Sequence, residues 1–136
     1  MAFTDNFRRQ HDELVAIVTE IAGDANDAAN KADAIAANLG KLSGKIRMHL
    51  TIEDKTLYPR LIGSADANTV ATAKKFQDEM GDLAGVYTGF ASKWQTAGDI
   101  QGNPAGFKSE FNGIVSALST RINSENTVLY PLADQC

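Results

Sequence analysis

The sequence predicts an all-α protein, an up-down-up-down four-helix bundle. Apolar residues recur at steps of three and four along four long segments, which is the spacing of one helix face. Short stretches rich in glycine, asparagine and proline separate these segments. Four long amphipathic helices joined by short loops leave no segment for a sheet, and they favour neighbouring helices that run antiparallel. The length of 136 residues favours one domain, residues 1–136, with a sizeable core.

The first half of the chain predicts two helices. The first begins after Thr4 or Asp5, either of which is a good N-cap, and ends near Gly23. Residues 24–31 are small and polar and predict a loop. The second helix is expected over about 31–59, because the proline at its end lacks a backbone N–H and kinks or ends a helix.

The second half predicts two further helices. A turn at 63–66 is followed by a third helix over about 67–96. Residues 98–106 are rich in glycine, asparagine and proline and predict a loop. Asn103 is the expected cap of a fourth helix, over about 104–132, with a proline at its first position.

Composition excludes several classes of partner. A net charge of −4 and a pI near 5.1 argue against binding to nucleic acid or to anionic membranes. No apolar run approaches the length of a membrane span, and the start of the chain lacks the pattern of a signal peptide. The single cysteine, Cys136, has no internal disulfide partner, so a reducing compartment is expected, and we expect the protein to be cytoplasmic.

One stretch, residues 48–59, places two polar groups on an apolar helix face. His49 and Glu53 are four residues apart, so they lie on one side of the helix and one turn apart. His11 lies on the apolar face of the first helix in the same way. Because burying bare polar groups is costly, these side chains need partners. Imidazole and carboxylate together suit iron, manganese or zinc, which makes the three residues candidate metal ligands.

The pattern of residues 48–59 recurs 72 positions later, over residues 120–131. Both copies contain a glutamate followed by Leu-Tyr-Pro, and the first and third helices also share a pattern. The chain is therefore predicted to be two similar helical hairpins. The first contains His11, His49 and Glu53, and the second has Met80, Arg121 and Glu125 at the equivalent positions.

The second copy lacks two ligands, which leaves two states open. A thioether is a poor ligand for iron, so Met80 is expected to fill core space. Arg121 cannot be deprotonated and cannot bind a metal. In one state a single ion is held by His11, His49 and Glu53, with Glu125 as a further ligand. In the other state there is no metal, and Arg121 neutralises the two glutamates.

Several neighbouring residues have structural interpretations. Glu79 is expected on a solvated flank of the third helix, although a swing toward the site would make it a ferritin-like carboxylate. Tyr58 and Tyr130 are expected to pack with their hydroxyls at the rim of the bundle. A hydrogen bond from either tyrosine to a metal ligand is the less favoured alternative.

At these residues the chain resembles the hemerythrin-like family, the HHE cation-binding domains. The first half matches through His11 and through His49-Leu50-x-x-Glu53-Asp54-x-x-Leu57-Tyr58-Pro59. In the second half Glu79-Met80 stands where the family has Glu-His, and Arg121-Ile122-x-x-Glu125 where it has His-Ile-x-x-Glu. The resemblance implies a bundle with a non-heme di-iron centre. It also implies roles in oxygen binding, in oxygen or nitric-oxide sensing, in iron handling or in repair of iron centres.

Three functions follow as hypotheses. The first is an iron-binding protein with an incomplete ligand set, His11, His49, Glu53 and Glu125. It would hold one ion or an incomplete pair, with dioxygen or nitric oxide as ligand and a sensing or storage role. The second is a metal-free module that acts through a protein partner or as a homo-oligomer. The third, a metal-dependent oxidoreductase, is the least favoured because no motif marks a substrate pocket, so we expect a binding protein rather than an enzyme.

Overall fold

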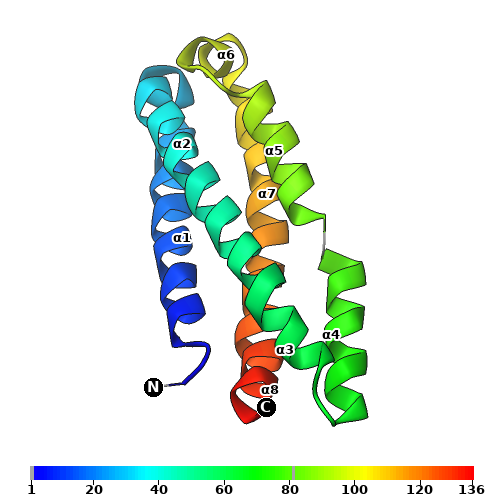
Figure 1. The fold of residues 1–136 in the computed structure, drawn as a ribbon. Coiled ribbons are helices and arrows are strands. Elements are labelled where there is room, and N and C mark those ends of the chain that lie inside the picture. The colour runs from blue at the N-terminus through cyan, green and yellow to red at the C-terminus, as the bar shows by residue number, and fades with distance from the viewer. Residues whose placement is uncertain (1, 81) are drawn as a thin grey trace.

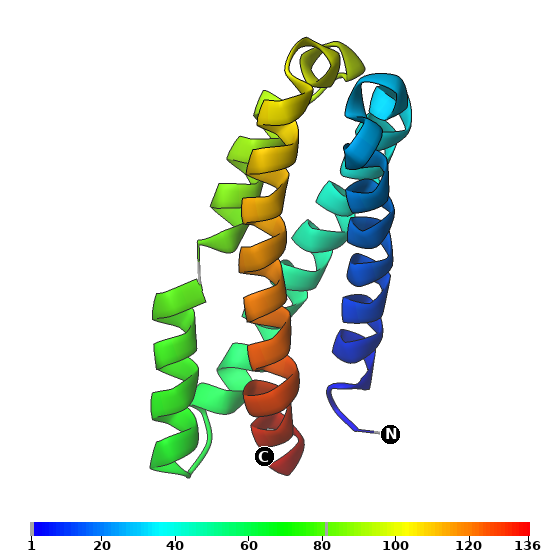
Figure 2. The same ribbon diagram turned by 180° about the vertical axis from the view of Figure 1, so that it is seen from behind.

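The computed structural model describes residues 2–80 and 82–136, without the side chain of Met80, and the regular elements in this part are all helical. Four long arms lie side by side and run up and down alternately, with both chain ends at the same end of the bundle (Figures 1 and 2). This arrangement confirms the predicted four-helix bundle. The arms are α1 (Asp5–Asp24), α2 (Ala28–Ile52) with α3 (Tyr58–Ile62), α4 (Ala67–Met80) with α5 (Leu83–Lys93), and α7 (Pro104–Ser124) with α8 (Tyr130–Gln135).

The connection in the first hairpin is shorter than the loop predicted at 24–31. A single 3-10 turn, η1 (Ala25–Asp27), joins α1 to α2, and α2 begins at Ala28. Ala25, Ala28 and Ala32 are at most 5% exposed. These small side chains pack into the core at the hairpin end. Their burial makes the segment helical, although its local composition favours a loop.

The third arm is interrupted, whereas the sequence predicted one helix over 67–96. It consists of α4 and α5, and α5 ends at Lys93. The predicted loop at 98–106 contains a short helix, α6 (Ala97–Gly102), instead. A capping box starts it: the Thr96 hydroxyl accepts from the Asp99 N–H, and the Asp99 carboxylate accepts from the Thr96 N–H. Asn103 caps α7 as predicted.

The second and fourth arms each contain a π-helical turn before their proline. These turns are η2 (Glu53–Leu57) and η3 (Glu125–Leu129), closed by bonds from the Tyr58 N–H to the Glu53 carbonyl and from the Tyr130 N–H to the Glu125 carbonyl. An α-helical turn would bring the proline ring against the carbonyl four residues earlier, and the wider turn relieves this clash. The proline therefore does not end the arm.

Each π turn shifts the register of the arm that follows it. In an unbroken α-helix Val128 and Leu132 would have continued the buried face of the fourth arm. In the structure Val128 is 38% exposed and Leu132 is partly buried, while Leu129 and Ala133 are fully buried. The π turn contains one residue more than an α-helical turn, so every buried position after it is shifted by one residue along the chain. A prediction that assumes 3.6 residues per turn throughout misses this shift.

The core consists of two apolar clusters with polar residues between them. The larger cluster is built mainly from α1, α2, α5 and α7. The smaller one gathers around Leu57, Leu61 and Leu129, and includes residues of α3 and α8. His11 on α1, Glu53 on the second arm, and Arg121 and Glu125 on the fourth arm fall between members of the two clusters, whereas Asn38 lies within the larger one. Within the part of the chain that the structure describes, no helix is both long and apolar enough to cross a membrane.

Candidate metal centre

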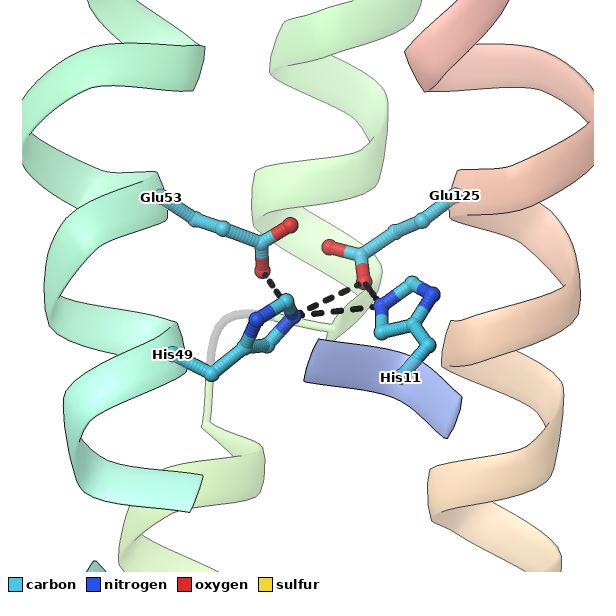
Figure 3. Close-up of side chains that lie close together, drawn as sticks. All are labelled: His11, His49, Glu53 and Glu125. Carbon is cyan, nitrogen blue, oxygen red and sulfur yellow. Dashed lines mark hydrogen bonds and ion pairs between the residues drawn. The ribbon is translucent and has the colours of Figure 1, made fainter. Parts of the chain in front are cut away.

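The structure brings four of the residues singled out in the sequence to one point of the core. His11 comes from α1 and His49 from α2, while Glu53 and Glu125 are the first residues of the two π turns (Figure 3). One donor atom from each residue lies within 4.8 Å of all the others. None of the four is more than 3% exposed. The group is therefore dry and contains two imidazoles and two carboxyl groups.

The spacing of the donor atoms suits a cation. The two imidazole Nε2 atoms are 3.1 Å apart. Nε2 of His11 is 2.9 Å from Oε1 of Glu125, and Nε2 of His49 is 3.2 Å from Oε1 of Glu53. Metal–ligand bonds of about 2.0–2.2 Å place neighbouring ligands about 3.0–3.5 Å apart. The group thus needs little rearrangement to surround one ion.

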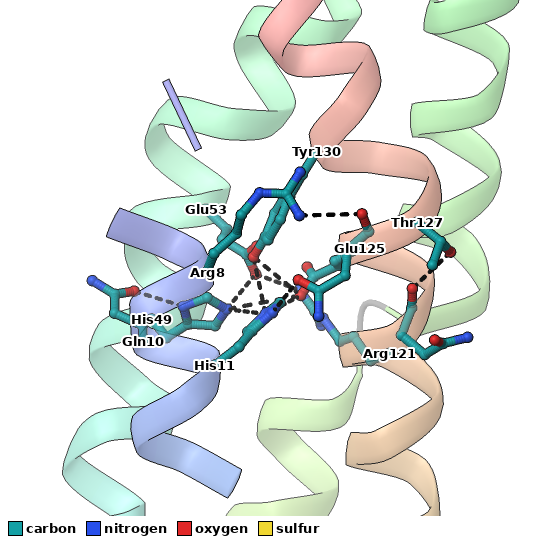
Figure 4. A network of polar contacts seen from close by, with 11 residues as sticks. Arg8, Gln10, His11, His49, Glu53, Arg121, Glu125, Thr127 and Tyr130 are labelled. Atoms are coloured by element: carbon teal, nitrogen blue, oxygen red, sulfur yellow. Dashed lines mark hydrogen bonds and ion pairs between the residues drawn. The ribbon is translucent and has the colours of Figure 1, made fainter. Parts of the chain in front are cut away.

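Two side-chain amides orient the imidazoles for metal binding. Nδ1 of His11 is 2.9 Å from the amide oxygen of Asn126. Nδ1 of His49 is 2.6 Å from the amide oxygen of Gln10, and both of these residues are labelled in Figure 4. An amide oxygen accepts, so each Nδ1 donates its hydrogen, and a ring without a hydrogen on Nε2 turns a lone pair toward the other. Two lone pairs 3.1 Å apart repel unless a proton or a metal ion lies between them. The donor set therefore fits a metal.

Neither amide was identified from the sequence. Gln10 directly precedes His11, and Asn126 directly follows Glu125, so both could have been noted as neighbours of candidate ligands. Their direction could not be read, because each contacts a histidine on another arm. Such outer hydrogen bonds fix the tautomer and the ring orientation of a metal-binding histidine.

Replacing Asn126 with alanine is expected to weaken metal binding about 10- to 100-fold, because the His11 ring loses the acceptor that fixes its tautomer. Isothermal titration of the metal-free protein measures the change. Asn126→Asp, which keeps an acceptor oxygen, should retain most of the affinity. Asn123→Ala, an exposed asparagine on the same arm, serves as the control. Equal affinities for Asn126→Ala and the wild type would contradict this role.

Arg121 occupies the position that corresponds to His49 in the second hairpin, and it points into the site. Its Nη2 is 3.4 Å from Oε1 of Glu53 and its Nε is 3.4 Å from Oε2 of Glu125. The residue is only 5% exposed. The guanidinium therefore bridges the two carboxyl groups, and charge-assisted bonds of this kind favour their ionised form.

The two carboxyl groups have different protonation behaviour. Burial raises the pKa of Glu53. Burial alone would also raise the pKa of Glu125, but hydrogen bonds from His11 and His49, with the nearby charge of Arg121, hold it well below its usual range. Two close carboxylates cannot both ionise cheaply without positive charge between them. The pair therefore favours a cation in its midst.

In the metal-free protein a proton supplies part of that positive charge. Burial lowers the pKa of His49, but hydrogen bonds to Glu125 and Glu53 and their negative charges together raise it to about 9. A metal ion must displace this proton in order to use the His49 lone pair. Arg121 and the protonated His49 thus stand in for metal charge when no metal is bound.

Tyr130 belongs to this group, and the prediction of a rim position is wrong for it. Its hydroxyl donates to Oε2 of Glu53 at 2.7 Å and lies 2.9 Å from Nε2 of His11 (Figure 4). The residue is fully buried, with its ring stacked on that of His11. Tyr130 follows the π turn directly, and the register shift turns it inward. Tyr58 is also buried, within the smaller cluster, and burial raises its pKa.

The third arm contributes no ligand among the side chains that the structure describes. Glu79 has a side chain that is 53% exposed and lies 3.9 Å from Lys75, which confirms the predicted solvated flank. The expectation that Met80 fills core space concerns a side chain outside the described part of the chain.

A surface pocket of about 440 Å³ opens between α5 and α7, with Leu83, Val86 and Ala117 in its wall and Arg121 among its lining residues.

Comparison with known proteins assigns the family. A family model described as the hemerythrin HHE cation binding domain matches residues 2–133, nearly the whole chain, so the chain belongs to this family. No curated protein and no solved structure matches the chain. The family implies cation binding, and the buried histidines and glutamates are a group that could hold the ion.

Proposed function

We propose that this protein binds iron at a mononuclear non-heme site whose ligands are His11, His49, Glu53 and Glu125. The observation that supports the proposal best is the 3.1 Å separation of two imidazole Nε2 atoms whose Nδ1 hydrogens are engaged elsewhere. Two nitrogen and two oxygen donors suit iron, manganese or zinc, and the resemblance to the hemerythrin-like family favours iron among them. The ion would supply Lewis acidity and one-electron chemistry. The protein residues would hold it in a buried site closed to water.

A single ion, rather than a pair, follows from Arg121. Its guanidinium contacts both carboxyl groups, which are the groups that would bridge or share two ions. A fixed positive charge at this place repels a second cation and cannot offer it a ligand. Two carboxylates, Arg121 and one divalent ion leave a net charge of about +1 in the core, whereas a second divalent ion would raise it to about +3.

We further propose that the bound iron interacts with a small diatomic molecule, dioxygen or nitric oxide, in a sensing or storage role. The pocket between α5 and α7 supports this proposal, because Arg121 both lines it and contacts the candidate ligands. Its wall combines aliphatic side chains with the charged side chains of Glu79, Asp82 and Arg121, and the aliphatic part suits an uncharged molecule. The absence of a cysteine pair in the sequence agrees with a reducing, cytoplasmic setting.

A metal-free module that binds a protein partner, or a second copy of the chain, is the second candidate. One observation favours it: Arg121 and the protonated His49 already neutralise the two carboxyl groups, so the core is electrically balanced without an ion. Metal content separates the two candidates.

The test is the metal content of the protein, made without a histidine tag and reconstituted with Fe(II) under anaerobic conditions. Mass spectrometry should find about one iron per chain in the wild type, since four ligands surround one point. His49→Ala should bring this value close to zero, while Asp54→Ala, an exposed acid on the same arm, should leave it unchanged. About two irons would contradict the mononuclear site. No iron in the wild type would overturn the proposal and favour the metal-free module.

A further inference from the structure

We propose that Tyr130 is a fifth protein ligand, bound through its phenolate oxygen when the iron is ferric. The proposal rests on the proposed iron site and assigns a role to a residue outside its four ligands. It predicts a spectroscopic property of the loaded protein that the histidines and glutamates alone cannot produce.

The hydroxyl of Tyr130 converges on the same point as the other donors. It lies 2.7 Å from Oε2 of Glu53, 2.9 Å from Nε2 of His11 and 3.5 Å from Oε1 of Glu125. These distances match those between the proposed ligands themselves. A tyrosine that merely packed at the rim of the bundle would not bring its hydroxyl, its only polar side-chain atom, into contact with three of the four proposed ligands.

The hydrogen bonds leave a lone pair of the Tyr130 oxygen on the inner side. A phenol has one hydrogen, and here it points to Glu53. With a metal bound, the ring of His11, whose Nδ1 donates to Asn126, would have no hydrogen on Nε2. Once a metal has displaced the Nε2 hydrogens, three lone pairs, from His11, His49 and Tyr130, would surround one point, and a cation there would be attracted by all of them.

Charge explains why the phenolate would bind the ferric form. Oxidation of Fe(II) to Fe(III) by an added oxidant such as ferricyanide moves one electron to the oxidant and adds one positive charge to the core. Breaking the O–H bond of Tyr130, forming a bond from its oxygen to iron and releasing the proton to solvent adds one negative charge. The net charge of a buried site then stays unchanged, and burying additional unpaired charge is costly. A phenolate is also a hard oxygen donor, as ferric iron prefers.

The fold favours Tyr130 over its counterpart in the first hairpin. Tyr58 follows the other π turn in the same way and is 2% exposed. Within the part of the chain that the structure describes, its hydroxyl makes no hydrogen bond to the four proposed ligands, whereas that of Tyr130 reaches three of them. Tyr58 therefore provides a matched control of the same residue type at the equivalent position.

The experiment compares wild type, Tyr130→Phe and Tyr58→Phe after loading with Fe(II) and oxidation with ferricyanide. The ferric wild type should show a phenolate-to-iron charge-transfer band in the visible spectrum, with phenolate vibrations in its resonance Raman spectrum. Both signals should persist in Tyr58→Phe and disappear in Tyr130→Phe, with iron content still about one per chain.

Two results would overturn the proposal while leaving the iron site intact: a ferric wild type with bound iron but no such band, or a band that survives in Tyr130→Phe. A wild type that binds no iron would overturn the proposed function and the phenolate ligand together. If Tyr130→Phe fails to hold iron, a second experiment labels the double variant Tyr58→Phe, Tyr87→Phe with ring-deuterated tyrosine and records its resonance Raman spectrum. Tyr130 is then the single tyrosine left, and its Raman bands must shift.

Discussion

Arg121→Ala is expected to destabilise the metal-free protein by about 3–5 kcal/mol, which is the typical cost of removing one partner from a buried ion pair. The guanidinium bridges Glu53 and Glu125, and both are at most 1% exposed. Without it, two carboxyl groups share one buried place with the positive charge of His49 alone. Urea denaturation followed by circular dichroism measures the loss. Saturation with Fe(II) should recover part of it, because the ion restores positive charge and binds the folded state.

An exposed arginine provides the comparison. Arg47→Ala, on the solvent side of α2, should change the free energy of unfolding by no more than about 0.5 kcal/mol. A loss well under 1 kcal/mol for Arg121→Ala itself would mean that its charge is not needed between the glutamates. In that case the argument that arginine replaces a second metal ion would also fail.

Replacing Arg121 and Met80 together with histidine should raise the iron content from about one to about two ions per chain. The duplication places these two residues where His49 and His11 stand in the first hairpin. The change removes the guanidinium between the carboxyl groups and adds two imidazoles on the side of the second hairpin. Metal content by mass spectrometry after anaerobic reconstitution with Fe(II) measures the result.

The matched control replaces the same two residues with leucine, which removes the positive charge but adds no ligand. This variant should stay at about one ion per chain. If the histidine variant also stays at one, the two hairpins are not equivalent around the site, and the interpretation of the chain as a repeated ligand pattern is wrong. Two ions in both variants would mean that charge alone, and not ligand number, limits the wild type.

The local part of the site could be predicted from sequence. The spacing of His49 and Glu53 fixes them on one helix face, and their place among apolar residues indicated burial. The capping box at Thr96 and Asp99 was also readable, as a threonine followed three residues later by an acid, although a loop was predicted there. These features depend on neighbours within one turn of helix.

The remaining parts of the site depend on contacts between distant residues. His11 meets Glu125 across 114 positions and Tyr130 across 119, and no periodicity within a helix predicts which arms face each other at that level. The π turns belong to the same class, because one extra residue in a turn changes which of Val128 and Leu129 is buried. A regular helical period predicts that Val128 is buried, whereas the structure buries Leu129.

The sequence by itself determined a four-helix bundle of two similar hairpins and the candidate residues His11, His49, Glu53 and Glu125, because helical periodicity and duplication are local or repeated properties of the chain. Only the tertiary structure decided that these residues meet, that Arg121 bridges the glutamates and that Tyr130 turns inward. Those facts depend on the packing of four arms and on the register after each π turn, where a shift of one residue exchanges a solvated side chain for a buried one.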